Sequence, residues 1–440
     1  MEELKDKLES SYIVFENELN GEANSAVHSM RREAFQNFEK LGFPTKRNEE
    51  WKYTNLKPIL KGDYKLFPKT EEDIEFKDVK KYFLNEIDSY KVVFINGVYS
   101  SWLSETTHRG YDICTFGNAL NKYPDAIEGY FNKIAKGENQ AMVSLNTAFA
   151  KEGAFIRVPK NTAVDKPIQI IFFNTTNDRE MMVQPRNLVI LEEGAKAEII
   201  ERHQSLVELP ILTNVVTEVS VGANAQLQYY KLQNDHHAAS LIDNTWVNQH
   251  RDSIARFSTF SFGGRLTRNN LHFALKESGS FAYMNGVTII EEGQHVDHHT
   301  LADHLVPHCE SHELYKGIYG GNAHGVFNGK IVVHKDAQKT NAFQQNDNIL
   351  VSDRANVDTK PQLEIYADDV KCSHGCTIGQ LDEEALFYLK SRGIGDKEAK
   401  ALLMYAFASD ALSEVGIRQL KEKVNMLIAK KLGVNLDFEL

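Results

Sequence analysis

Short runs of β-branched and aromatic residues, separated by polar turn residues, occupy the middle of the chain. The clearest runs cover 154–159, 168–173, 187–191, 198–201, 215–221 and 226–231. Runs of this length and composition are typical of β-strands. Because helical spacing is almost absent between these runs, the pattern predicts a mainly β core over residues 153–376.

A weak internal repeat runs through this core. Gly194, Gly222, Asp252 and Gly279 each stand three residues before an alanine, at intervals of 28, 30 and 27 residues. A constant period with short strands suits a solenoid, in which each coil pairs its strands with the coils above and below. A jelly roll or sandwich gives similar runs but requires no constant period. The repeat therefore favours a parallel β-helix, with about nine or ten coils.

Helical periodicity flanks the core on both sides. Before it, apolar residues recur at three- and four-residue spacing at Val27, Met30, Ala34, Phe38 and Leu41. After it, Asp382, Asp396 and Ser413 each open a segment with helical spacing. We therefore expect an N-terminal helical and mixed domain over 1–152, the β core over 153–376 and a C-terminal helical domain over 377–440.

The composition limits the cellular compartments and the classes of binding partner that fit this chain. The net charge of −11 argues against nucleic acid and anionic membranes as partners, and runs such as 170–173 are too short to span a bilayer. The N-terminus shows no secretory pattern, and four cysteines in 440 residues do not form a disulfide framework. These features predict a cytoplasmic protein.

The segment Cys372-Ser-His374-Gly-Cys376 places two thiols and an imidazole within five residues. On a strand, Cys372 and His374 would project to the same face, whereas Gly375 leaves the side of Cys376 open. Thiolate and imidazole bind iron, iron–sulfur clusters or zinc. Taken alone, this spacing is more often a buried cysteine beside a surface histidine, and Cys376 is as readily a small filler as a third ligand.

A histidine-rich stretch supports an alternative function. It contains His295, His298, His299, His304, His308 and His312. His295-Val-Asp297 copies two ligands of the facial triad of non-haem iron oxygenases, so a cytosolic, His-rich, metal-dependent enzyme remains an alternative. A carbohydrate-active β-helix enzyme would need clustered carboxylates, of which Asp368-Asp369 is the only close pair between 361 and 381. We interpret the histidines first as a structural ladder between stacked coils and second as a route for sulfur or iron.

The stretch from 361 to 407 resembles the SufB/SufD family, the scaffold subunits of an iron–sulfur cluster assembly machine. Further matching segments are Glu49–Thr54, Asp297–Thr300, Leu314–Gly317, Gly325–Lys330 and Asp336–Thr340. SufB-type chains carry a cysteine in the strand that here reads Pro361–Ile365, and isoleucine 365 cannot bind iron. The chain therefore resembles the SufD type.

This resemblance implies a right-handed parallel β-helix in a non-catalytic scaffold that pairs with a SufB-type chain and a SufC-type ABC ATPase. It makes Cys372 and His374 partial ligands of a nascent iron–sulfur cluster shared with the partner. It leaves room for a flavin in the assembled complex and for a homodimer when the chain is alone.

Nucleotide binding is expected in the ATPase partner, since Gly263-Gly264 and Gly320-Gly321 lack the lysine of a phosphate-binding loop. The C-terminal helices carry more large apolar residues than two short helices can bury. Those assigned to partner binding are Phe387, Tyr388, Leu402, Leu403 and Phe407. They either cap the end of the solenoid or form the docking surface for the ATPase, and we expect both roles on different faces.

Overall fold

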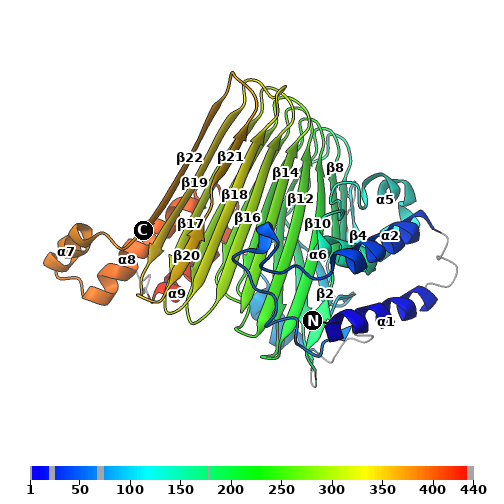
Figure 1. The fold of residues 1–440 in the computed structure, drawn as a ribbon, viewed down its shortest axis with the longest axis horizontal. Coiled ribbons are helices and arrows are strands. Elements are labelled where there is room, and N and C mark those ends of the chain that lie inside the picture. The colour runs from blue at the N-terminus through cyan, green and yellow to red at the C-terminus, as the bar shows by residue number, and fades with distance from the viewer. Residues whose placement is uncertain (1, 19–24, 67–73, 109, 177–178, 434–440) are drawn as a thin grey trace.

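Two long β-sheets face each other and form the body of the molecule (Figure 1). The computed structural model describes residues 2–18, 25–66, 74–108, 110–176 and 179–433. Among these residues sheet 1 has twelve strands and sheet 2 has ten. From residue 186 onward the chain alternates between the sheets, and the neighbouring strands of each sheet are parallel. The parallel β-helix predicted from the sequence is therefore confirmed.

The strands follow one another along the solenoid axis. Sheet 1 consists of β4 Asp112–Thr115, β5 Ala154–Val158, β8 Arg186–Leu191, β10 Ile211–Val221, β12 Ala239–Gln249, β14 Leu266–Leu275, β16 His295–His304, β18 His324–Val333 and β20 Asn356–Thr359, with β1 Lys65–Leu66, β7 Met181–Val183 and β21 Gln362–Ile365 beside this row. Sheet 2 consists of β3 Val98–Tyr99, β2 Tyr90–Ile95, β6 Ile168–Asn174, β9 Lys196–Ser205, β11 Gln226–Gln233, β13 Ile254–Ser261, β15 Phe281–Ile290, β17 Glu310–Tyr319, β19 Asn341–Leu350 and β22 Lys371–Gly379.

Each coil uses close to the number of residues that the repeat indicated. Ile211 pairs with Ala239, 28 residues further on, and Ser240 pairs with Leu266, 26 residues further on. The solenoid has about eight turns, so the expected nine or ten was too high. The repeat itself agrees with the lower number, because the 224 residues from 153 to 376 contain eight coils of 28 residues.

The repeated turn residues form a stack of left-handed backbone conformations. Gly194, Asn224, Asp252 and Gly279 all have φ between 55° and 77°. The N–H of Gly194 donates to the carbonyl of Ala223 in the next coil, and this pattern continues along the stack. Glycine, asparagine and aspartate tolerate this conformation best, which explains the spacing of turn residues in the sequence.

One member of the sequence repeat was aligned wrongly. The strand pairing places Ala197, Leu227, Ala255 and Ala282 in one column. The turn residue of the second coil is therefore Asn224 and not Gly222, two residues earlier. The error arose because Ala225 occupies a turn position, where alanine also fits.

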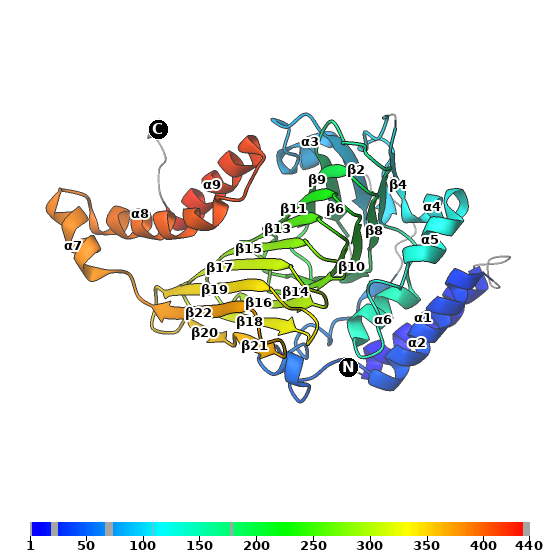
Figure 2. The same cartoon turned by 90° about the horizontal axis from the view of Figure 1, so that it is seen from above.

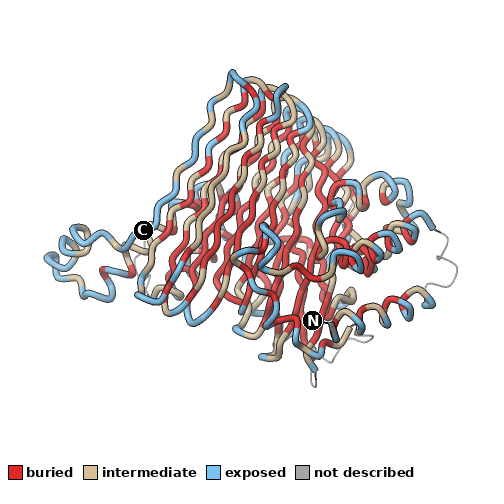
Figure 3. The backbone as a smooth tube through the Cα atoms, viewed as in Figure 1, coloured by how far each residue is buried: buried red, intermediate tan, exposed pale blue. Residues whose placement is uncertain are grey.

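The space between the two sheets is filled mainly by apolar side chains. Val219, Val247 and Phe273 of sheet 1 pack there against Phe257 and Met284 of sheet 2. Figure 3 shows buried backbone through the middle coils and exposed backbone at the last coil. The apolar interior supports stacking of the coils, because burial of apolar surface is the main favourable contribution to folding.

Helices precede and follow the β-helix, and several of them cover the outer faces of its sheets. They are α1 Glu2–Glu18, α2 Ala26–Leu41, η2 Glu49–Trp51, α3 Phe76–Val79, η3 Lys80–Tyr82, α4 Phe116–Lys122, α5 Pro124–Tyr130, α6 Ala141–Ala148, α7 Glu383–Ser391, α8 Asp396–Ser409, η4 Asp410–Leu412 and α9 Arg418–Leu432. Helices α1, α2 and α6 pack on Leu212 and Ile242 of sheet 1, whereas α8 and α9 pack on Leu232 and Phe260 of sheet 2. The two helical groups therefore lie on opposite sides of the β-helix (Figure 2).

Among the described residues, none of these helices is both long enough and apolar enough to cross a membrane.

A buried ion pair connects the helical N-terminal region to the solenoid. The carboxylate of Glu218 accepts a hydrogen bond from Arg186, and both side chains are fully buried. Glu218 also accepts the backbone N–H groups of Asn132, Ile134 and Ala135, at 2.8, 3.0 and 3.0 Å. One carboxylate therefore holds both the neighbouring coil and the loop between α5 and α6.

Replacing Glu218 by alanine should lower the free energy of unfolding by about 3–5 kcal/mol, because Arg186 would keep a buried charge without a partner. Urea unfolding followed by circular dichroism measures the change. Glu193→Ala is the matched control, since Glu193 forms an exposed pair with Lys160 and should cost no more than about 1 kcal/mol. Equal losses in the two variants would contradict this assignment.

Candidate functional site

Cys372, His374 and Cys376 form one row on β22, the last strand of sheet 2. This strand pairs with β19 over all nine of its residues, and Gly375 keeps the ladder intact opposite Gln345. Alternate residues of a strand share a face, so the three side chains lie on the same side. Cys372 stands above Ala342 of the interior core, which shows that this side faces the solenoid axis. Gly375 therefore does not interrupt the strand, and Cys376 lies on the same side as Cys372 and His374.

The row lies on the open end of the solenoid. We call this surface the end face and define it by the last-coil residues Thr359, Leu363, Ile365, Cys372, His374, Cys376 and Ile378. Cys372 is half-buried against the interior core, whereas His374 and Cys376 are exposed. The Sγ atom of Cys376 lies 2.7 Å from the Oγ1 atom of Thr359, which comes from the opposite sheet. The last coil therefore brings thiol, imidazole and hydroxyl groups to one accessible surface.

The described C-terminal helices do not cap the end face, contrary to one of the two roles expected for them. Helices α8 and α9 pack along the side of the solenoid, on the outer face of sheet 2. Within the described chain no further strand pairs with β22 or with β20 and β21. An uncovered strand edge presents free N–H and C=O groups, and Ile378 beside it is 50% exposed. The end face thus combines an open sheet edge with apolar surface.

The possible metal ligands on the end face are the thiols of Cys372 and Cys376 and the imidazole of His374. In the part of the chain that the structure describes, no group of three or more His, Cys, Asp or Glu side chains is arranged to hold a metal ion. Burial raises the pKa of the Cys372 thiol above its ordinary value. A bound metal stabilises a thiolate strongly, so deprotonation of Cys372 is favoured when a metal is present.

His295, Asp297 and His299 lie on the outer face of β16 and do not form an open iron site. Asp297 accepts hydrogen bonds from Arg268 at 2.5 Å and from Thr54, and its other oxygen is 3.2 Å from His299. The Arg268 guanidinium is the main cause that keeps the pKa of Asp297 far below its usual value, against the opposing effect of burial. Oδ2 of Asp297 is engaged by Arg268 and Thr54, whereas Oδ1 is buried within ion-pair distance of His299 and makes no hydrogen bond within the described chain. The arginine paired with this carboxylate weakens the oxygenase alternative.

The segment Glu49–Thr54 covers these outer-face residues. The indole ring of Trp51 lies 4.2 Å from the guanidinium carbon of Arg268, and Glu50 is 3.2 Å from His299. The sequence comparison had marked this segment without assigning it a role. Its side chains connect the segment between α2 and β1 to strands β14 and β16. The contacting residues are more than 200 positions apart, so sequence spacing cannot predict these contacts.

The remaining histidines are accounted for by local contacts. His298 and His304 face the solenoid interior, where His298 contacts Thr288 at 2.9 Å and His304 contacts Ser311 at 2.8 Å. Burial lowers the pKa of both to about 4, so both rings are neutral near pH 7. His308 adopts the left-handed turn conformation, and His312 stacks on neighbouring aromatic rings. These contacts support the structural interpretation of the histidine-rich stretch.

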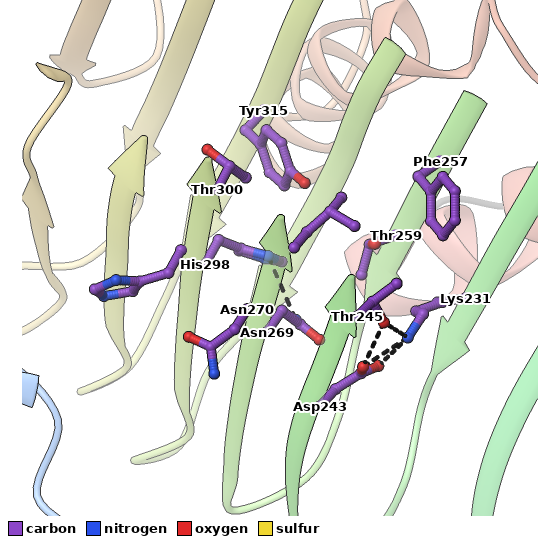
Figure 4. A pocket seen from close by; sticks show the side chains of 12 residues that line it. Lys231, Asp243, Thr245, Phe257, Thr259, Asn269, Asn270, His298, Thr300 and Tyr315 are labelled. Carbon is purple, nitrogen blue, oxygen red and sulfur yellow. Dashed lines mark hydrogen bonds and ion pairs between the residues drawn. The ribbon is translucent and has the colours of Figure 1, made fainter. Parts of the chain in front are cut away.

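A second polar group lies inside the solenoid, and sequence reasoning missed it. Lys231 donates to Asp243 at 2.5 and 2.6 Å and to Thr245 at 2.7 Å, and all three side chains are buried (Figure 4). They line a small cavity together with Asn269 and His298. Alternation of polar and apolar residues along a strand does not tell which side faces the interior. The pairing register shows that these polar side chains point inward.

The residues expected to bind a partner divide into two groups. Phe387 and Tyr388 on α7 are 74% and 56% exposed, and no residue of α7 is buried. Leu402 and Leu403 are half-buried on α8. Phe407 packs against the C-terminal apolar cluster, and the ammonium group of Lys316 lies 4.6 Å from its ring centre. The free apolar surface is therefore concentrated on α7, which lies away from the β-helix (Figure 2).

Comparison with known proteins gives two matches to family profiles. The SufBD core domain of the SUF iron–sulfur cluster assembly system matches residues 172–407, and the SufBD protein N-terminal region matches residues 2–170. An iron–sulfur cluster assembly SufBD family protein of Synechocystis is 31% identical over 421 residues, covering 93% of this chain and 92% of the relative. The iron–sulfur cluster assembly protein SufD of Escherichia coli is 30% identical over 405 residues, covering 90% and 91%. The SufD protein of Bacillus subtilis is 28% identical and covers 71% and 72%.

The four cysteines should differ in their rate of alkylation at pH 8. Cys376 is exposed and should react first, whereas burial raises the pKa values of Cys372 and Cys309 and brings that of Cys114 to about 11. We expect rates at least ~10-fold lower for Cys114 and the buried Cys309, because the thiolate is the reacting form. Tandem mass spectrometry after iodoacetamide treatment measures the order, and Cys376→Ala should remove the fast phase. Reaction of Cys309 as fast as Cys376 would show that the described coil packing is wrong.

Proposed function

Because this chain belongs to the SufBD family of iron–sulfur cluster assembly proteins, we propose that it is a scaffold subunit that holds part of a nascent cluster on its end face. One observation carries the proposal: Cys372 and His374 share a face of the terminal strand, and that face is accessible. The cluster is the cargo of the scaffold and is passed on after assembly.

The rest of the coordination comes from a SufB-type partner chain. Iron–sulfur clusters are held mainly by cysteine thiolates, with histidine at some positions, and this chain offers too few donors for a complete set. Position 365, where the SufB type is expected to carry a cysteine, is an isoleucine above Val333 of the interior core. It provides apolar contact area instead of a ligand.

The open edge of the last coil is the surface for this pairing. Strand addition to β22 would satisfy its free backbone groups and cover the apolar side chains of Ile365 and Ile378. When no SufB-type chain is present, the same edge is available to a second copy of this chain. Pairing at the end face also brings the partner's ligands next to Cys372 and His374.

The ATPase of the assembly machine is a separate, SufC-type subunit, and α7 is its docking element. Phe387 and Tyr388 are large aromatic side chains on an exposed helix, a composition that is enriched at interfaces. The chain itself acts as a non-catalytic scaffold. The four free cysteines suit a reducing cytoplasm.

His374→Ala should abolish cluster maturation in cells while leaving folding and complex formation intact, because a neutral imidazole binds iron without losing a proton. The measurement is complementation of a strain lacking this subunit, together with size-exclusion chromatography of the complex. His237→Ala is the matched control, since His237 is an exposed loop residue far from the end face in sequence. Full rescue by His374→Ala would remove the end face from its proposed role.

The double substitution Phe387→Ala and Tyr388→Ala should weaken binding of the ATPase subunit by roughly 30-fold, the loss expected when an aromatic interface anchor worth about 2 kcal/mol is removed. Isothermal titration calorimetry with the purified ATPase subunit measures the affinity. Trp102→Ala removes another exposed aromatic residue, outside α7, and should leave the affinity unchanged. Unchanged affinity in the α7 variant would place the docking surface elsewhere.

A further inference from the structure

A column of inward-facing residues on sheet 2 changes character as it approaches the end face. In the register of the strands, Tyr229, Phe257 and Met284 follow one another in successive coils. The next three coils continue this column with Glu313, Gln344 and His374. A column that served packing alone would stay apolar, so the switch to carboxyl, amide and imidazole needs another explanation.

Glu313 and Gln344 are hydrogen-bonded to each other inside the solenoid. The Nε2 atom of Gln344 donates to Oε2 of Glu313 at 2.6 Å, and the two residues are 2% and 4% exposed. Among the described residues no cation pairs with Glu313, and burial raises its pKa to about 7. A buried carboxyl group without a cationic partner destabilises the fold. Its presence beneath the end face therefore points to a function.

The amide of Gln344 lies close to Gly329 of the opposite sheet. A Cβ atom on Gly329, across the interior, would lie 2.3 Å from Nε2 of Gln344, so the glycine makes space for this amide. With Nε2 engaged by Glu313, the carbonyl oxygen Oε1 is buried and has no hydrogen-bond partner. Since Nε2 is engaged by the preceding coil, Oε1 is the polar atom of the amide that remains for the following coil, which carries His374.

We propose that Gln344 and Glu313 are positioning residues for His374. Oε1 of Gln344, which has no hydrogen-bond partner in the described structure, is the acceptor for the N–H of one ring nitrogen of His374 when the ring turns toward it, and Glu313 keeps the Gln344 amide from turning over. The other ring nitrogen then presents its lone pair outward from the end face, ready for iron. Adjacent strands are about 4.8 Å apart, which puts Gln344 and His374 within reach of each other.

This inference deepens the proposed function and rests on it, because it assigns the support of one proposed ligand. Histidines that bind metals commonly donate their second N–H to a carboxylate or carbonyl, which fixes the tautomer and the ring orientation. Here the acceptor would be an amide oxygen oriented by a carboxyl group one coil deeper. Both positioning residues lie on this chain, so they act before any partner docks.

The test is the tautomer of His374 in the full-length chain, labelled with ¹⁵N-histidine and measured at pH 8 by long-range ¹H–¹⁵N correlation. His374→Ala identifies the signal. Gln344→Leu should shift the tautomer ratio by about 3- to 10-fold, the effect of losing one hydrogen bond. Gln345→Leu is the matched control, because Gln345 is the next residue, faces the opposite side of β19 and bonds to Asp347.

Two substitutions of Glu313 test the deeper member of the pair. Glu313→Gln keeps an oxygen that can accept from Gln344 and should preserve the wild-type tautomer ratio. Glu313→Met copies Met284 of the same column, so it should fold, and it should shift the ratio as Gln344→Leu does. An unchanged ratio in both Gln344→Leu and Glu313→Met would overturn the proposal.

Cluster maturation in the complementation assay separates this proposal from the function on which it rests. Gln344→Leu should reduce maturation by less than His374→Ala does, because it removes the support of the ring and leaves the ligand in place. Full rescue by His374→Ala would refute the cluster site, yet the tautomer ratio would still decide whether Gln344 and Glu313 position the ring. Normal maturation in Gln344→Leu, together with an unchanged tautomer ratio, would count against the positioning role.

Discussion

The structure depends on the hydrogen-bond ladder that joins each coil to the next in parallel register. Every inner strand is satisfied on both edges by strands about one coil before and after it. This arrangement requires a first and a last strand, and the last one, β22, has a free edge in the described chain. The place where the ladder stops is also the place where Cys372 and His374 become accessible. The same constraint that builds the solenoid therefore creates the surface at which it can be extended by another chain.

Strand register also determines which residues become neighbours in space. Residues about 28 positions apart stand above one another, so one column can carry apolar side chains in the middle coils and polar ones near the end. The column that leads from Met284 through Glu313 and Gln344 to His374 shows this change. Buried polar groups cost stability unless they are paired. Their concentration beneath an accessible imidazole is best understood as support for the end face.

Buried ion pairs attach the N-terminal region to the solenoid. Arg186 with Glu218 and Arg268 with Asp297 each combine a charge pair with contacts to segments far away in the chain. Through Thr54 and Trp51, the second pair occupies the histidine-rich face of β16 with structural contacts. The proposed ligands lie on β22 at the end of sheet 2, whereas this face belongs to β16 of sheet 1.

The sequence by itself determined the local features of this protein. Short β-branched runs, turn residues at a period in the high twenties and helical spacing at both ends were enough to predict a parallel β-helix with flanking helices. The row of Cys372 and His374 also followed from two-residue alternation. These features are local, or repeat at a constant interval, so they can be read from spacing.

Only the tertiary structure decided which side of each strand faces inward and which contacts span long separations. It showed that β22 runs unbroken through Gly375, which puts Cys376 in the same row, and that α8 and α9 lie along the side of the solenoid. It also revealed the pairing of Gln344 with Glu313 and of Thr54 with Asp297. Strand register and docking of distant segments depend on the sum of many weak contacts across the fold, and no local pattern in the sequence encodes that sum.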